Sequence, residues 1–197
     1  SIAESSRKSL LLKSINPVSG GCINQCFKIL GVDSSCFFLK KNSKSFLPFF
    51  KAEAHALKEI NATSTIQVPN VITYGESDTS SFLVLEFLIE GSSTRKGQYR
   101  LGEQLAEMHR SPKEYFGWEI DNCIGATPQP NPFSIDWISF YRDYRLLHQF
   151  NLAEKKGCIF EGKSELLDNL ETFFLGYSPY PSLLHGDLWG GNTGYTQ

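Results

Sequence analysis

The sequence lacks several features that mark particular classes of protein. Its 197 residues carry 19 Lys and Arg against 21 Asp and Glu, so the formal net charge is −2 and there is no basic excess for nucleic acid or an anionic membrane surface. Near the N-terminus, the apolar run Leu10–Leu12 is too short for a signal-peptide core or a membrane span. We therefore expect a cytoplasmic protein with no nucleic-acid or membrane partner, in which any phosphate binding is local.

Paired cysteines and clustered histidines are also missing. Five cysteines are an odd number without secretory context, which argues against a disulfide framework. Cys22 and Cys26 have no second Cys or His pair at the spacing of a zinc site. A metallophosphoesterase needs several His and Asp ligands at tight spacing, whereas the four histidines here are widely scattered: His55, His109, His148 and His185.

What is present is ordinary for a globular protein. With 41% hydrophobic and 20% charged residues, the chain can form one domain or two small lobes that share a cleft. Short apolar stretches in Leu11–Phe38, separated by turns rich in Gly, Pro, Asp and Ser, predict antiparallel strands. Gly20 and Gly21 in the first turn would let backbone N–H groups face an anion, although a Gly pair is more often only a tight turn.

A strand and a helix follow, and they carry opposite charges that could pair. Phe49–Ile60 has helical periodicity, and Glu53 falls inside its apolar stripe. An inward carboxylate is costly unless it is paired, and the strand Cys36–Lys41 ends in two candidate cations. Lys40 is the natural partner, but period-two alternation alone does not choose it over Lys41. The alternatives are that Glu53 reaches solvent at the edge of the stripe and that the lysine is a solvated edge residue.

Two further strand-like runs lead to an expected lobe boundary. Val71–Tyr74 and Phe82–Leu88 are apolar, and the polar stretch Ser92–Lys96 follows them. Because a buried strand gives way to Gly, Ser and charge, we predict an N-terminal nucleotide-binding lobe over residues 1–90 and a partial helical lobe over 91–197. If the fold is that of a nucleotide kinase, the backbone of three residues of this strand would meet the adenine: Glu86, Phe87 and Leu88.

The second half is predicted to be mostly helical. Phe116–Phe133 contains three prolines and is expected to be a structured loop rather than one regular element. Aromatic side chains then recur at helical spacing, a pattern that is more often core than ligand site: Trp137, Phe140, Tyr141 and Tyr144. A further helix is expected around Ser164–Leu175.

The most informative stretch is Leu183–Asn192, which reads LLHGDLWGGN. An Asp followed five positions later by an Asn fits the catalytic-loop spacing of kinases. In such a loop, Asp187 would accept the proton of the attacking hydroxyl and Asn192 would hold a metal ion against the nucleotide phosphates. The bare Asp-to-Asn spacing also fits a polar, Gly-rich turn, whereas the full decapeptide is far more specific.

Four stretches together resemble the fructosamine kinases, also called ketosamine 3-kinases, which are relatives of the aminoglycoside phosphotransferases within the protein-kinase-like fold. They are Pro17–Gln25 (PVSGGCINQ), Phe82–Leu88 (FLVLEFL), Phe116–Leu146 and Leu183–Asn192. The third discriminates best, because generic phosphotransferases share the Asp and Asn spacing but do not look like this segment. Phe133 and Gly190 depart mildly from relatives, where Trp and Ser are usual.

The resemblance implies an α+β, two-lobed kinase-like fold, with an antiparallel sheet and one helix in the N-terminal lobe and a mostly helical C-terminal lobe. It implies transfer of the ATP γ-phosphoryl group, with Mg²⁺, to the 3-hydroxyl of a fructosamine or ribulosamine, and so repair of glycated amines or proteins. By position, Asp187 is the catalytic base and Asn192 a magnesium ligand. The resemblance further implies that Lys40 holds phosphates with Glu53 as its partner, and that Gly20, Gly21 and Cys22 lie in the nucleotide loop.

Kinases hold a second metal ion through an Asp beyond the catalytic loop, yet no acidic residue follows Asp187 here. We therefore expect a fragment that binds Mg-ATP poorly. The alternatives are an inactive pseudokinase or nucleotide-binding module, or another small-molecule phosphotransferase of the same superfamily. A thiol among backbone N–H donors favours oxidation, so a homodimer linked through Cys22 is a further hypothesis, with an inert small residue as its alternative.

Overall fold

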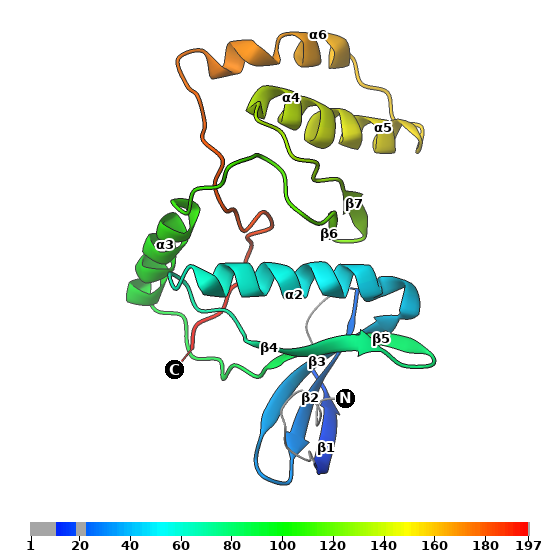
Figure 1. The fold of residues 1–197 in the computed structure, drawn as a ribbon, viewed down its shortest axis with the longest axis vertical. Coiled ribbons are helices and arrows are strands. Elements are labelled where there is room, and N and C mark those ends of the chain that lie inside the picture. The colour runs from blue at the N-terminus through cyan, green and yellow to red at the C-terminus, as the bar shows by residue number, and fades with distance from the viewer. Residues whose placement is uncertain (1–10, 19–22, 197) are drawn as a thin grey trace. The chain divides into compact units, whose positions relative to one another are not determined.

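A computed structural model describes residues 11–18 and 23–196 of the chain (Figure 1). The described residues divide into two compact units. The first runs to His109 and also takes in the segment from Leu184 onward, and the second spans Arg110–Leu183. The lobe boundary expected between residues 90 and 91 stays a prediction, since this division rests on compactness alone.

A five-stranded antiparallel sheet with the order β1-β2-β3-β5-β4 forms the centre of the first unit (Figure 1). Short runs of β-branched and aromatic residues between Gly, Ser and Asp turns produce these strands, as their pattern predicts. Asp33, in the turn between β2 and β3, accepts a hydrogen bond from the Ser35 backbone N–H at 3.0 Å. The strands are β1 (Leu12–Pro17), β2 (Gln25–Gly31), β3 (Cys36–Ser43), β4 (Val71–Glu76) and β5 (Ser80–Glu86).

Helix α2 (Leu47–Ala62) follows the short 3-10 turn η1 (Lys44–Phe46) and packs on one face of the sheet (Figure 1). Pro48 in its first turn suits a helix start, because the missing N–H has no intrahelical partner there. Its apolar stripe buries Phe50 and Ala54 against two residues of β5, Leu83 and Leu85. This cluster is the core of the unit, and it fixes α2 over β4 and β5.

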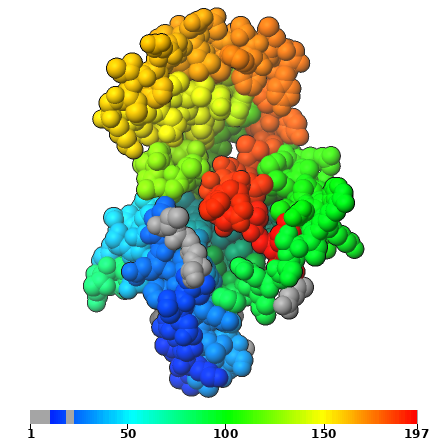
Figure 2. Space-filling model, turned by 180° about the vertical axis from the view of Figure 1, so that it is seen from behind, coloured from blue at the N-terminus to red at the C-terminus, as the bar shows by residue number. Residues whose placement is uncertain are grey.

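Helix α3 (Arg95–His109) and the C-terminal segment complete the first unit. Thr196 forms an isolated antiparallel bridge with Glu90, and the Gly91 N–H donates to the Tyr195 carbonyl at 2.5 Å. A Cβ on Gly97 would lie 2.9 Å from the Tyr195 ring, so this position suits glycine. Figure 2 shows the red C-terminal segment beside a green part of the chain.

The second unit contains a short hairpin, β6 (Asn122–Ile124) and β7 (Thr127–Gln129), inside the predicted proline-rich loop. Gly117 needs its positive φ of 97°, and a Cβ there would lie 2.2 Å from the Pro132 carbonyl oxygen. Buried Asn131 ties the loop together by donating to the Ile120 carbonyl at 3.0 Å and accepting from Arg145 at 2.6 Å.

The helices of this unit follow the loop. The predicted aromatic stripe is a packing feature: the rings of Trp137 and Tyr141 stack at 5.3 Å, and Phe116 lies 5.2 Å from Trp137. The helix expected around Ser164–Leu175 is instead broken in two. The elements are α4 (Trp137–Tyr141), the π-helical turn η2 (Arg142–Leu147), α5 (His148–Glu154), α6 (Lys163–Asp168) and the 3-10 turn η3 (Leu170–Phe174). Within the described residues, no helix is both long and apolar enough to cross a membrane.

Candidate active site

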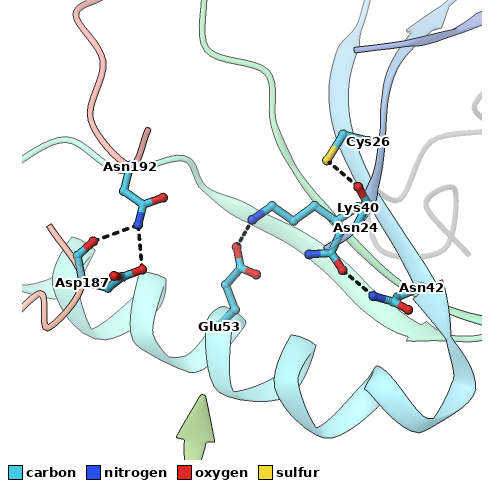
Figure 3. A network of polar contacts seen from close by, with 7 residues as sticks. All are labelled: Asn24, Cys26, Lys40, Asn42, Glu53, Asp187 and Asn192. Carbon is cyan, nitrogen blue, oxygen red and sulfur yellow. Dashed lines mark hydrogen bonds and ion pairs between the residues drawn. The ribbon is translucent and has the colours of Figure 1, made fainter. Parts of the chain in front are cut away.

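Lys40 and Glu53 form an ion pair, as their positions predicted. The Lys40 Nζ atom lies 2.6 Å from the Glu53 Oε1 atom, and the two side chains are 25% and 32% exposed (Figure 3). Lys40 is paired with Leu83 of the core in the β3–β5 register, so its side chain is on the face that α2 covers. Lys41 lies on the opposite face, where it lines a shallow groove with Leu39. The strand register therefore identifies Lys40, and not Lys41, as the partner of Glu53, a choice that the alternation of side chains in the sequence left open.

Lys40 is paired with Cys26 of the adjacent strand β2. The cysteine side chain is 7% exposed, and burial is the main cause that raises the pKa of its thiol. The charge of Lys40 opposes this shift, and that of Glu53 adds to it. The thiol is therefore neutral at physiological pH, so the ion pair has an uncharged side chain as its neighbour on β2.

The predicted catalytic loop folds on itself through Asn192. Its Nδ2 atom donates to the Asp187 backbone carbonyl at 2.8 Å and to the Asp187 Oδ2 atom at 3.0 Å (Figure 3). The Asn192 backbone N–H also donates to the Trp189 carbonyl at 2.9 Å, which closes a turn. This exposed carboxylate is thus held by an amide and is open to a ligand, which is the arrangement that a general base requires.

Two glycines of this loop have conformational reasons to be glycine. Gly186, directly before the aspartate, has a φ of 80°, a region that residues with a side chain rarely adopt. A Cβ on Gly191 would lie 2.3 Å from the Trp189 ring, whereas a Cβ on Gly190 would meet nothing within 4 Å. The Asp187 N–H donates to the His185 Nδ1 atom at 3.3 Å.

The histidine at the end of α3 is electrostatically linked to the same loop. Burial, followed by the nearby His185 imidazole, lowers the pKa of His109 from its ordinary value of 6.5. His109 is therefore uncharged at neutral pH and adds no positive charge beside the loop.

The stretch expected to meet adenine lies at the end of β5. Glu86 is the last residue of the strand, and Phe87 and Leu88 follow it, all three half-buried. The Glu86 Oε2 atom accepts from the Asn70 Nδ2 atom at 2.7 Å, and the ammonium of Lys28 lies 4.3 Å from the centre of the Phe87 ring. The Glu86 backbone N–H already donates to the Asn70 carbonyl at 2.8 Å. The contact of these three residues with adenine stays a prediction.

Three predicted residues, Gly20, Gly21 and Cys22, lie outside the described residues, so the phosphate loop and the redox-linked dimer stay predictions. The described residues contain no group of three or more His, Cys, Asp or Glu that could hold a metal ion. Asn192 fits a magnesium site in part. Its amide nitrogen is engaged with Asp187, which leaves the Oδ1 oxygen as a hard ligand of the kind that Mg²⁺ prefers.

Sequence reasoning missed one pair of polar residues beside this site. Asn42, two residues after Lys40 on β3, donates from its Nδ2 atom to the Asn24 Oδ1 atom at 2.8 Å (Figure 3). Their separation of 18 residues follows no periodic pattern. The available signal was their position: Asn24 comes shortly after the predicted Gly20–Gly21 turn, and Asn42 comes directly after the predicted strand Cys36–Lys41.

The family model described as fructosamine kinase matches residues 1–197. The chain belongs to the fructosamine kinase family. It is 37% identical over 97% of its length to a probable ketoamine kinase of Synechocystis, and 40% identical over 95% to a chloroplastic protein-ribulosamine 3-kinase of Arabidopsis thaliana. It spans 65% and 59% of these two relatives, respectively.

Solved structures of the family show the same fold. A putative fructosamine-3-kinase from Haemophilus somnus matches with a TM-score of 0.90 at 28% identity, covering 99% of this chain and 66% of that one. A second, from Thermobifida fusca, matches with a TM-score of 0.82 at 27% identity, covering 99% and 68%. The kinase-like α+β fold expected from the sequence is therefore confirmed.

Proposed function

We propose that the protein transfers the γ-phosphoryl group of ATP to the 3-hydroxyl of ketoamines, the adducts that glycation leaves on amines. The observation that carries this proposal is the Asp187 and Asn192 turn. It belongs to the same compact unit as the Lys40 and Glu53 pair. An anchored carboxylate and a paired lysine are two of the groups that a protein supplies for phosphoryl transfer, besides its metal ligands. Family membership supports the substrate class, because relatives carry the names ketoamine kinase and ribulosamine 3-kinase.

In this mechanism, Asp187 accepts the proton of the sugar hydroxyl as the oxygen attacks the γ-phosphorus. The Asn192 amide holds the Oδ2 atom and the backbone carbonyl of Asp187, so the carboxylate keeps one orientation. Lys40 is aligned by Glu53 and donates to phosphate oxygens through its remaining N–H groups. Mg²⁺, when bound, neutralises the charge of the phosphates, and Asn192 would hold it through Oδ1.

The finer assignments belong to the same proposal. ATP as donor, Mg²⁺ as cofactor, a cytoplasmic setting and the absence of nucleic-acid and membrane partners all follow from sequence reasoning and family resemblance. Nothing in the described part of the chain favours the alternative of an inactive nucleotide-binding module.

An assay of the natural full-length protein tests this function. The purified protein is incubated with Mg-ATP and with ribulosamine, erythrulosamine or fructosamine adducts of a free lysine derivative and of a glycated protein. We expect ADP release that depends on the ketoamine, together with a phosphate ester on O3 identified by ³¹P NMR. The unglycated amine and the free sugar are the controls. Equal ADP release with these controls, or no ester with any ketoamine, would contradict the proposal.

A further inference from the structure

Asn42 uses its side chain for three hydrogen bonds beside the candidate site. Its Nδ2 atom donates to the Asn24 Oδ1 atom at 2.8 Å and to the Ile23 backbone carbonyl at 3.3 Å. Its Oδ1 atom accepts from the Ser43 backbone N–H at 2.7 Å. One amide thus connects the residues before β2 with the end of β3 (Figure 3).

These bonds begin where the backbone pairing of β2 and β3 ends. The register between the two strands runs from Leu30 opposite Cys36 to Gln25 opposite Lys41, which is the last pair at this end. Beyond it, the amides of Asn24 and Asn42 extend the ladder through their side chains. The terminal pairs of a ladder open most easily unless something holds them, so this contact protects the pairs at the end.

One of the protected pairs includes Lys40, the positive charge of the ion pair. Cys26 opposite Lys40 is the second pair from the end, and the buried thiol is the β2 neighbour of the lysine. Opening this end of the ladder would move the thiol away and expose the ion pair between Lys40 and Glu53 beyond its present 25% and 32%. The orientation of the lysine toward phosphates would then vary.

We propose that Asn42 is a positioning residue of the nucleotide site, which acts through Asn24 and Ile23 to keep the start of β2 in register beside Lys40. This inference rests on the proposed function, because it assigns Asn42 a part in binding the phosphate donor. Asn42 does not touch the nucleotide in this account. Its effect is on how tightly ATP binds and not on the chemical step or on the ketoamine.

The natural full-length protein is tested as Asn42→Ala and Asn42→Asp. The second variant keeps an oxygen for the Ser43 N–H but cannot donate to Asn24. Loss of one or two modest hydrogen bonds predicts a KM for ATP that is raised about three- to tenfold in both variants. The kcat should stay within about twofold of wild type, and the KM for the ketoamine should not change. Asn16→Ala is the matched control, because its Nδ2 atom donates at 3.1 Å to the Ser14 hydroxyl on β1 in an exposed contact.

Asn24→Ala is the second test of the same contact. It should raise the KM for ATP by a similar factor. The double variant with Asn42→Ala should be no worse than Asn42→Ala alone, because both substitutions remove the same contact between the two amides. A thermal melt reports folding for each variant. Unchanged KM for ATP in both Asn42 variants, an equal rise in the KM for the ketoamine, or multiplicative effects in the double variant would overturn the inference.

Isothermal titration with Mg-ATP separates this inference from the proposed function. If wild type binds ATP but phosphorylates no ketoamine, the proposed function fails. The ATP affinity of Asn42→Ala, compared with wild type and Asn16→Ala, still decides the role of Asn42. If wild type does not bind ATP, both are contradicted.

Discussion

The ion pair between Lys40 and Glu53 gives the sharpest prediction on stability. At a separation of 2.6 Å, the Coulomb attraction in a medium of effective dielectric constant of about 20 is about 6 kcal/mol. Desolvation of both groups offsets most of it, and exposed pairs retain only about 0.2 to 1 kcal/mol. Since the side chains are 25% and 32% exposed, we expect a net coupling of about 1 to 2 kcal/mol after screening by solvent.

A double-mutant cycle of Lys40→Met and Glu53→Gln measures this coupling by urea unfolding. Lys40→Met should lower the free energy of unfolding by about 1 to 2 kcal/mol, because it leaves the carboxylate next to the apolar stripe of α2 without a partner. Lys41→Met is the control: this lysine is exposed on the other face of the sheet, so its loss should change stability by no more than about 0.5 kcal/mol. A coupling near zero, or equal effects of the two lysine variants, would refute the reasoning.

Two further predictions concern a helix start and a loop glycine. Asp136 is the N-cap of α4 and accepts from the Ser139 N–H at 2.7 Å, so Asp136→Ala should destabilise the protein by about 1 kcal/mol at pH 7. Hydrogen bonding to Ser139 lowers the pKa of Asp136 below its ordinary 3.8. The part of this difference that comes from the charged carboxylate should be fully present well above the ordinary pKa and shrink as the pH falls through the lower folded pKa, which urea unfolding at successively lower pH checks. Gly191→Ala should displace the Trp189 ring and shift tryptophan fluorescence, while Gly190→Ala should not; identical spectra would contradict the close contact.

Much of the first unit could be predicted from the sequence, because its signals are local. Alternating apolar residues between Gly, Pro and Asp turns are sufficient for β2 and β3, and a 3.6-residue period is sufficient for α2. The inward position of Glu53 even predicted a cation partner, since an unpaired buried carboxylate is costly. The choice of Lys40 over Lys41 required the register of β3 against β5, which depends on contacts far apart in the chain.

Other features depend on tertiary contacts that no local pattern encodes. The hydrogen bond from Asn42 to Asn24 joins the two open ends of the β2–β3 hairpin. In the sequence, each amide is indistinguishable from an ordinary polar surface residue. Similarly, the break between α6 and η3 at Asn169 follows no Pro or Gly, although the Asn169 Nδ2 atom donates to the Glu165 carbonyl at 2.8 Å. A side chain that bonds its own backbone competes with the helix, so the break has a physical reason that periodicity cannot show.

The role of Asp187 is the central claim, and the turnover of Asp187→Asn tests it most directly. The variant keeps the size of the side chain and an oxygen that can accept from Asn192, but it cannot take a proton from the sugar hydroxyl. In the natural full-length protein, with saturating ATP and ketoamine, we expect kcat to fall by about 10²- to 10⁴-fold while the affinity for ATP stays within about twofold of wild type. A kcat close to that of wild type would show that another group takes the proton, and it would contradict the account.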